Sequence, residues 1–142
     1  MNKYGQIVII EDDHDDQDML KEILLELKVE NDVSLFDNGE KALEYLRKED
    51  VKPFLILCDI NMPVIDGYSL KKIIQDEPEL NDKCIPFLFI STDASSKSIS
   101  QAYKLSVQGI FKKPVSYSQW KEIVHHIVLY WTDCMSPNRT DD

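Results

Sequence analysis

Apolar residues occur along this chain in two alternating patterns, short unbroken runs and longer stretches with helical spacing. Unbroken runs are typical of strands that are covered on both faces, because both rows of side chains are then buried. We predict five such strands: Ile7 to Ile10, Val33 to Phe36, Phe54 to Cys58, Phe87 to Ile90 and Ile110 to Phe111. The second and the fifth have the weakest patterns.

Between these runs, apolar residues recur at the three- and four-residue spacing of amphipathic helices. The predicted core faces of the first three helices are Leu20, Ile23, Leu24 and Leu27, then Ala42, Leu43 and Leu46, then Leu70, Ile73 and Ile74. A fourth helix, from about Ala94 to Leu105, is rich in serine and therefore only weakly anchored. The fifth begins at Ser116, which has Gln119 at capping-box spacing, and carries a broad apolar stripe from Trp120 to Trp131.

Strands that alternate with helices in this way are typical of an α/β fold with a parallel sheet and helices on both faces. The pattern predicts one doubly wound, flavodoxin-like domain of five βα units. Asn38-Gly39, Asp66-Gly67, Pro78 and Gly109 provide turn signals between the elements. We assign residues 1–132 to this domain and residues 133–142 to a short polar C-terminal tail.

Composition narrows the function classes. The formal charge of −10 argues against nucleic acid and anionic membranes as partners, because both need clustered Lys and Arg. No apolar stretch is long enough to span a bilayer or to act as a signal peptide. The three cysteines are an odd number without metal-ligand spacing, which favours a reducing compartment. We therefore expect a cytoplasmic protein.

Reactive side chains follow the strands at the ends where an open α/β sheet binds its ligand. The first strand ends in Glu11 and Asp12, and the third ends in Asp59. Ser91 with Thr92 follows the fourth strand, and Lys113 follows the fifth. We expect these side chains to meet at one edge of the sheet.

Carboxylates from two strands repel one another at short range, and a divalent cation removes that cost. Mg²⁺ suits such a site because it prefers oxygen ligands and is usually held by a few carboxylates together with a phosphate. Lys113 then pairs with Asp59 at rest or with a phosphoryl oxygen, and the Ser91 hydroxyl donates to another. Asp59 is either a metal ligand only or the nucleophile itself, since carboxylates do accept phosphoryl groups.

Several motifs, in order and at the usual spacing, give the chain its resemblance to a known family. They are Ile-Ile-Glu-Asp-Asp from Ile9, Asp-Ile-Asn-Met-Pro from Asp59, Asp66-Gly67, Ser91 and Lys113-Pro114. Over nearly its whole length the chain resembles the CheY-like receiver domains of response regulators, in their stand-alone form. A narrower likeness is to the receiver-only regulators of bacterial phytochrome kinases. The resemblance implies the strand order 2-1-3-4-5.

The resemblance also implies roles for individual residues. Asp59 is the phosphorylation site. Glu11, Asp12 and Asp59 hold Mg²⁺, Asp12 directly and Glu11 through water, and the backbone carbonyl of Asn61 completes the protein's share of the metal shell. The phosphoryl donor is a phosphohistidine on a sensor histidine kinase or a phosphotransfer protein, and the phosphoaspartate is later hydrolysed at the same site. Lys113-Pro114 is expected to be a cis peptide that aims the lysine inward.

Two positions depart from the family pattern. Ile110 stands where receivers usually carry a Tyr or Phe that acts as a switch, and the adjacent Phe111 should point to the opposite face of the sheet. Thr92 is bulkier than the Ala or Gly that is common there, so it can narrow access to the phosphoryl group. We expect output by contact, through a homodimer or partner face formed by the fourth helix, the fifth strand and the fifth helix.

Three other functions compete with this one. An aspartate-nucleophile phosphatase needs a second carboxylate two residues after the nucleophile, where this chain has Asn61. A flavodoxin-like nucleotide binder needs a phosphate loop after the first strand, and acidic residues there would repel phosphate. A receiver fold that serves only as a docking module remains open because of Ile110. The three histidines, His14, His125 and His126, have no partners at metal-ligand spacing.

Overall fold

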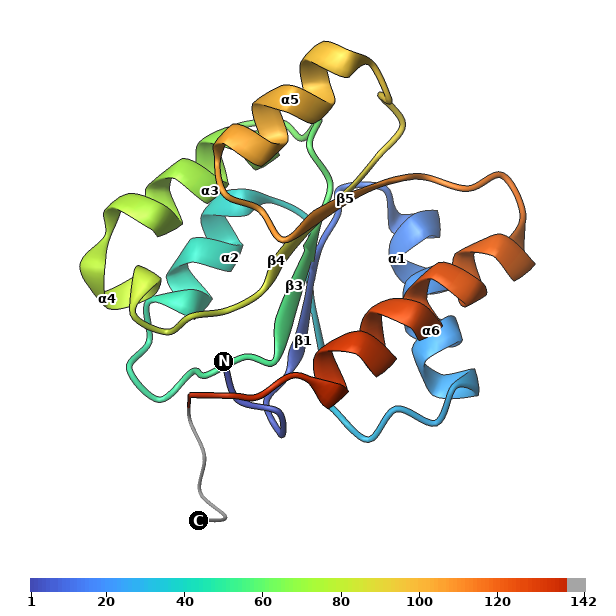
Figure 1. Ribbon diagram of the computed structural model, residues 1–142, viewed down its shortest axis with the longest axis horizontal. Coiled ribbons are helices and arrows are strands. Elements are labelled where there is room, and N and C mark those ends of the chain that lie inside the picture. The colour runs from blue at the N-terminus through green and yellow to red at the C-terminus, as the bar shows by residue number, and fades with distance from the viewer. Residues whose placement is uncertain (138–142) are drawn as a thin grey trace.

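The computed structural model describes residues 1–137 of the chain (Figure 1). A five-stranded parallel sheet of order β2-β1-β3-β4-β5 lies between two layers of helices. The strands are β1 (Ile7–Ile10), β2 (Val33–Phe36), β3 (Leu55–Cys58), β4 (Phe87–Ser91) and β5 (Gly109–Lys112). The helices are α1 (His14–Glu26), α2 (Gly39–Leu46), α3 (Gly67–Asp76), α4 (Pro78–Asn81), α5 (Ser96–Lys104) and α6 (Tyr117–Asp133). The predicted α/β fold and strand order are confirmed.

Two hydrophobic cores lie on opposite faces of the sheet. In β1, Val8 and Ile10 belong to the core shared with α2, α3 and α5, whereas Ile7 and Ile9 belong to the core shared with α1 and α6. All four side chains are fully buried. This alternation explains why the strand is an unbroken apolar run.

The described structure contains one helix that the sequence pattern did not predict. The one-turn helix α4 begins at Pro78, which we had interpreted as a turn signal. Proline fits the first position of a helix, because its missing N–H group would have no partner there and its φ angle is already helical. The strand β5 is also longer than predicted, since Gly109 and Lys112 pair with β4 although neither is a strongly apolar residue.

Helix α5 is the predicted fourth helix, and it is weakly anchored as expected, because only Ala102 in it is buried. Helix α6 is the predicted fifth helix. Its Trp120 is buried and Trp131 packs against the core shared with α1. Helix α6 includes Asp133, the first residue of the predicted tail, and residues 138–142 of that tail lie outside the described residues.

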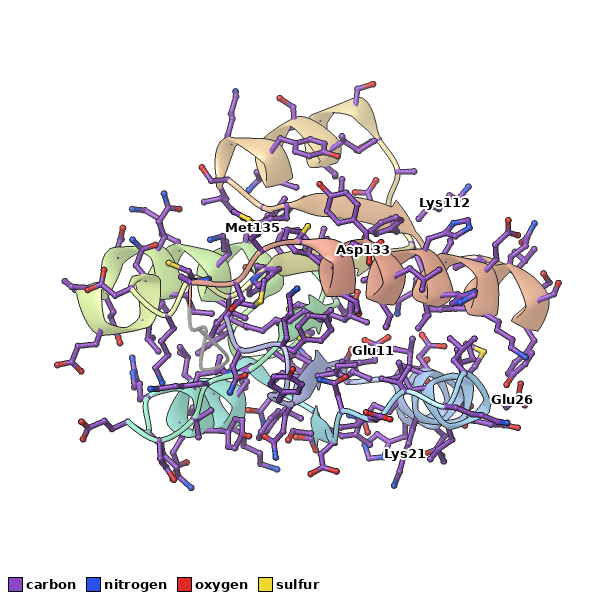
Figure 2. The ribbon with its side chains drawn as sticks, turned by 60° about the horizontal axis from the view of Figure 1, so that its bottom comes forward. Glu11, Lys21, Glu26, Lys112, Asp133 and Met135 are labelled. Atoms are coloured by element: carbon purple, nitrogen blue, oxygen red, sulfur yellow. The ribbon has the colours of Figure 1, made fainter. Side chains whose placement is uncertain are left out.

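The distribution of charged side chains separates the interior from the surface. Glu11 lies inside, beside the sheet, whereas Lys21 and Glu26 of α1 have exposed side chains (Figure 2). The three cysteines have free thiols. Within residues 1–137, no helix combines the length and the apolar character that crossing a bilayer requires.

Candidate functional site

An acidic cluster forms where β1 and β3 end. Each of Glu11, Asp12 and Asp59 offers one carboxylate oxygen, and these three oxygens lie within 4.8 Å of one another. The strand pairing produces this arrangement, because the amide of Asp59 donates to the carbonyl of Ile10 at 2.9 Å. Oδ1 of Asp59 accepts a hydrogen bond from the amide of Ile60 at 2.8 Å, which fixes the orientation of the carboxylate.

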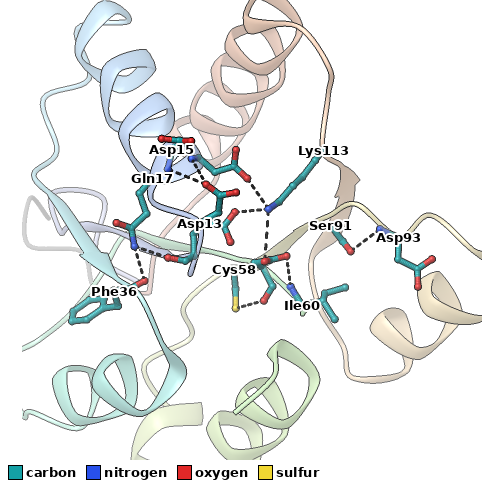
Figure 3. Close-up of polar contacts among 12 residues, drawn as sticks. Asp13, Asp15, Gln17, Phe36, Cys58, Ile60, Ser91, Asp93 and Lys113 are labelled. Carbon is teal, nitrogen blue, oxygen red and sulfur yellow. Dashed lines mark hydrogen bonds and ion pairs between the residues drawn. The ribbon is translucent and has the colours of Figure 1, made fainter. Parts of the chain in front are cut away.

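Lys113 extends from the end of β5 into this cluster (Figure 3). Its amide donates to the carbonyl of Ser91 at 2.8 Å, which continues the pairing of β4 with β5. Its Nζ atom lies 2.8 Å from Oδ2 of Asp16, contacts Oε1 of Glu11, and lies 3.7 Å from Oδ2 of Asp59. Three carboxylates therefore surround one ammonium group.

The electrostatic balance of the cluster is strongly perturbed. Burial, followed by the neighbouring Asp59 carboxylate, raises the pKa of Glu11 to about 9. Burial also raises the pKa of Asp59. Burial opposes the charge of Lys113, but hydrogen bonds with Asp16 and Glu11 outweigh it and raise the pKa of the ammonium group. One lysine does not compensate the negative charge that this site gathers.

The residues present fit a small divalent cation. Oε2 of Glu11 is buried and has no hydrogen-bond partner among residues 1–137. A buried carboxylate oxygen without a partner is costly, so it indicates that something else completes the site. The candidate metal ligands are all carboxylate oxygens, which Mg²⁺ prefers over softer ligands.

Ser91 lies at the end of β4 and is fully buried. Its Oγ atom accepts a hydrogen bond from the amide of Asp93 at 3.1 Å. The Asp93 carboxylate in turn accepts from the amide of Ser95 at 2.9 Å and from the hydroxyl of Ser98 at 2.5 Å. Polar contacts thus connect the Ser91 hydroxyl to the first turn of α5, while Thr92 between them is exposed.

The loop from β3 to α3 passes over the other side of the site. Asn61 is exposed, and the role of its backbone carbonyl as a ligand stays a prediction. Val64 adopts a φ angle of 69°, a left-handed conformation that is unfavourable for a β-branched residue. Gly67 packs so closely that a Cβ atom there would lie 2.6 Å from the carbonyl oxygen of Asp59.

The side chains of β5 alternate as predicted. Ile110 packs against the core shared with α3 and α5, and Phe111 packs against the core on the opposite face. An aromatic ring is nevertheless present on the Ile110 side, because Tyr68 of α3 packs edge-on against Phe89 with ring centroids 5.7 Å apart. Helix α3, rather than β5, contributes this ring.

One geometric expectation is wrong. The Lys113–Pro114 peptide is trans, since no cis peptide occurs among the described residues. Trans is the lower-energy form even before proline. The Lys113 side chain points inward without a cis bond. Its amide is hydrogen-bonded to β4, and its ammonium group forms ion pairs inside the site.

Two neighbouring residues of α1 at this site were not predicted. Asp16 forms an ion pair with Lys113, and the side-chain amide of Gln17 donates to the carbonyls of Glu11 at 2.5 Å and Phe36 at 3.2 Å. The available signal was their place in the first turn of the helix that follows the acidic strand end. Asp13 caps that helix, because its side chain accepts hydrogen bonds from the amides of Asp15 and Asp16, and Lys112 is exposed.

The fold and this site together define an α/β domain of the response-regulator class. The family model of the response regulator receiver domain matches residues 7–125, and the chain belongs to that family. Family members are signalling domains of two-component systems, and the acidic pocket of the family binds Mg²⁺. This membership sets aside the phosphatase and the nucleotide binder as alternatives.

Individual relatives show how far the similarity extends. The chemotaxis protein CheY-3 of Vibrio cholerae is 32% identical over 122 residues, which cover 86% of this chain and 90% of the relative. The crystal structure of the phosphorylated cyanobacterial phytochrome response regulator RcpA superposes with a TM-score of 0.84 at 29% identity, covering 94% of this chain and 97% of that chain. A magnesium-bound receiver domain of the sensor histidine kinase PA1611 from Pseudomonas aeruginosa shares the fold, with a TM-score of 0.73 at 21% identity over 92% of this chain and 98% of that one.

Proposed function

We propose that the chain is a phosphoacceptor of a two-component phosphorelay, which takes a phosphoryl group onto Asp59 with the help of Mg²⁺. The donor is a phosphohistidine of a sensor histidine kinase or of a phosphotransfer protein. One observation carries the proposal: Asp59 offers one of three carboxylate oxygens that lie within 4.8 Å of one another, and the Lys113 ammonium lies 3.7 Å from the Asp59 Oδ2 atom. The proposal is also supported by the similar response regulator RcpA, whose crystal structure is of the phosphorylated form.

The transfer requires a nucleophile and a way to neutralise charge. A carboxylate oxygen of Asp59 forms the new P–O bond, the P–N bond of the donor breaks, and the donor imidazole nitrogen keeps the bonding pair. Lys113 neutralises a phosphoryl oxygen and the Ser91 hydroxyl donates a hydrogen bond to another. Mg²⁺, held by Glu11, Asp12, Asp59 and the Asn61 carbonyl, supplies further charge neutralisation when bound. Water later hydrolyses the phosphoaspartate at the same site.

The signal leaves the site as a change in protein contacts. When the Ser91 hydroxyl donates to a phosphoryl oxygen, its Oγ atom is drawn toward the phosphoryl group, which alters the hydrogen bond that it accepts from the Asp93 amide, and Asp93 holds the first turn of α5. Ile110, which packs against the core shared with α3 and α5, is the residue that would act as the switch. Thr92 and Pro114 would limit access to the phosphoryl group. Helix α5 is therefore the element whose position responds.

The contact surface that we propose for output is formed by α5, β5 and α6 and holds a second copy of the chain. The strand β5 is the edge of the sheet, and Leu129 and Tyr130 of α6 expose half or more of their surface. A groove of about 380 Å³ lies beside them and is bordered by Phe111 and Trp131. Light scattering with and without beryllium fluoride tests this dimer, and a Leu129→Glu variant should remain monomeric in both states.

Acetyl phosphate with Mg²⁺ provides the direct test of the proposed function. We expect one base-labile phosphoryl adduct by intact mass spectrometry, lost in Asp59→Asn and on chelation of the metal. Asp76→Asn, at an exposed position of α3, is the matched control and should keep the adduct. Absence of any adduct in the unmodified chain would overturn the proposal in favour of a docking module.

A further inference from the structure

The resting position of Lys113 points to a further residue on which the reaction depends. We infer that Asp16 is a positioning residue that holds the Lys113 ammonium in its working orientation. The inference deepens the proposed function and rests on it, because Lys113 has this task only if Asp59 receives a phosphoryl group. Asp16 belongs neither to the acidic cluster nor to the family motifs quoted above.

Two carboxylates hold the Lys113 ammonium group in place. A lysine ammonium has three N–H donors. Two of its contacts are at hydrogen-bond distance, one to Oε1 of Glu11 and one to Oδ2 of Asp16 at 2.8 Å. The Asp59 carboxylate, at 3.7 Å, lies beyond that distance. Lys113 is thus held from two sides, and one N–H group is left for the side where Asp59 lies.

The two carboxylates that hold Lys113 differ in their relation to the candidate metal site. Glu11 belongs to the cluster that suits a divalent cation, whereas Asp16 does not. A cation among Glu11, Asp12 and Asp59 would repel the nearby ammonium group and compete with it for Glu11. Asp16 is then the carboxylate that keeps Lys113 at the rim of the site when the metal is bound.

A positioning group must itself be fixed, and hydrogen bonds hold the backbone around Asp16 in place. Its amide donates to Oδ1 of the capping residue Asp13 at 3.2 Å. The next residue, Gln17, ties α1 to the ends of β1 and β2 through two carbonyls. The side chains of Lys113 and Asp16 are only 12% and 22% exposed, so this pair is less screened than a surface ion pair.

Asp16→Asn tests the inference with a well-matched control. Asp15→Asn makes the same chemical change one residue earlier, in the same turn of α1, at an exposed side chain. We expect Asp16→Asn to slow phosphorylation by acetyl phosphate about tenfold, which corresponds to one lost charge-assisted hydrogen bond. Asp15→Asn should stay within about twofold of the unmodified chain. Asp16→Glu, which keeps the carboxylate, should recover part of the rate.

A double-mutant cycle separates positioning from mere structural support. If Asp16 acts through Lys113, Asp16→Asn should have no further effect on the rate in a Lys113→Met background. Mg²⁺ affinity gives a readout that needs no phosphorylation, because Trp120 borders the same small cavity as Glu11, Asp59 and Lys113 and can report binding by fluorescence. Asp16→Asn should weaken Mg²⁺ binding several-fold, as the released lysine competes with the metal, and this effect too should vanish in Lys113→Met.

The outcomes distinguish the two proposals. Equal rates and equal Mg²⁺ affinities for Asp16→Asn and Asp15→Asn would overturn the role of Asp16, even if Asp59 is phosphorylated. A loss in Asp16→Asn that persists in Lys113→Met would also overturn it, because the effect would then not pass through the lysine. If no adduct forms but the Mg²⁺ cycle shows the coupling, the proposed function fails while the positioning contact stands.

Discussion

The hydroxyl group of Tyr68 in α3 donates a hydrogen bond to the backbone carbonyl of Ser98 in α5, 3.1 Å away. Ser98 also donates from its own hydroxyl to Asp93, whose amide contacts the Ser91 hydroxyl. Tyr68 therefore joins α3 to the same turn of α5 that the candidate site contacts through β4. Position 110 carries isoleucine rather than an aromatic residue, so Tyr68 of α3 provides an aromatic side chain that contacts α5 near the site.

Removing the Tyr68 hydroxyl should loosen α5. We expect Tyr68→Phe to lower the free energy of unfolding by about 1 kcal/mol, because the hydrogen bond that joins α3 to the partly buried Ser98 carbonyl of α5 is lost. Hydrogen exchange of the α5 amides should also become faster. Urea denaturation and exchange mass spectrometry check both effects. Tyr103→Phe, at an exposed tyrosine of the same helix, is the control and should change neither.

The close approach of Gly67 to the β3 end should make this position intolerant of a side chain. A Cβ atom there would lie 2.6 Å from the Asp59 carbonyl oxygen and 2.8 Å from the Ile60 Cα atom. Gly67→Ala should destabilise the fold by about 2 to 3 kcal/mol, as overpacking against backbone does. Gly39→Ala, whose added atom would meet only the Ile65 side chain and carbonyl at 3.2 Å or more, should cost clearly less in the same thermal melts.

The left-handed backbone at Val64 predicts a stabilising substitution. Its φ angle of 69° is costly for a β-branched residue, whereas glycine adopts it without a steric penalty. Val64→Gly should raise the stability by about 1 kcal/mol and therefore raise Tm. Val115→Gly, at another highly exposed valine without a positive φ angle, should give no gain. A lower Tm for Val64→Gly would contradict the strain argument.

Lys71 should make the stability depend on alkaline pH. It is buried in α3, no ion pair to its ammonium occurs within residues 1–137, and burial lowers its pKa. The unfolded chain then binds more protons at alkaline pH than the folded chain, so stability should rise as pH increases from the lowered folded pKa toward the unfolded value. Lys71→Met should reduce this rise by the contribution of Lys71.

The same substitution should also stabilise the protein at neutral pH, by on the order of 1 kcal/mol, because a buried ammonium that lies over the Phe87 ring but forms no ion pair within residues 1–137 is replaced by an apolar side chain. Lys72→Met is the matched control, since Lys72 is exposed and pairs with Asp76 at 2.7 Å. It should leave the alkaline rise intact. Urea midpoints measured across the alkaline range separate the two variants.

The fold could be predicted from sequence where burial alone decides the pattern. Strands β1, β3 and β4 are buried on both faces and therefore appear as unbroken apolar runs. The pattern is incomplete where the backbone contributes more than the side chains. Gly109 and Lys112 extend β5 through pairing, and Pro78 begins a one-turn helix, and neither feature has an apolar signature.

The site was predictable to the extent that strand topology places it. Glu11, Asp59 and Lys113 meet because parallel strands end at one edge of the sheet. Asp16 was missed because its role depends on how α1 is rotated about its axis. Two other acids in the same turn, Asp13 and Asp15, do not contact the lysine. Spacing alone does not rank three neighbouring carboxylates by their distance from a lysine 97 residues away.

The sparse burial of α5 has an energetic consequence. A helix that buries only Ala102 gives up little hydrophobic free energy when it shifts. Reversing a two-state population from 1:99 to 99:1 takes about 5.5 kcal/mol of differential binding. A helix so lightly attached needs less free energy to move than one embedded in the core. Under the proposed function, the few charged hydrogen bonds of one added phosphoryl group would therefore be a sufficient force to shift α5.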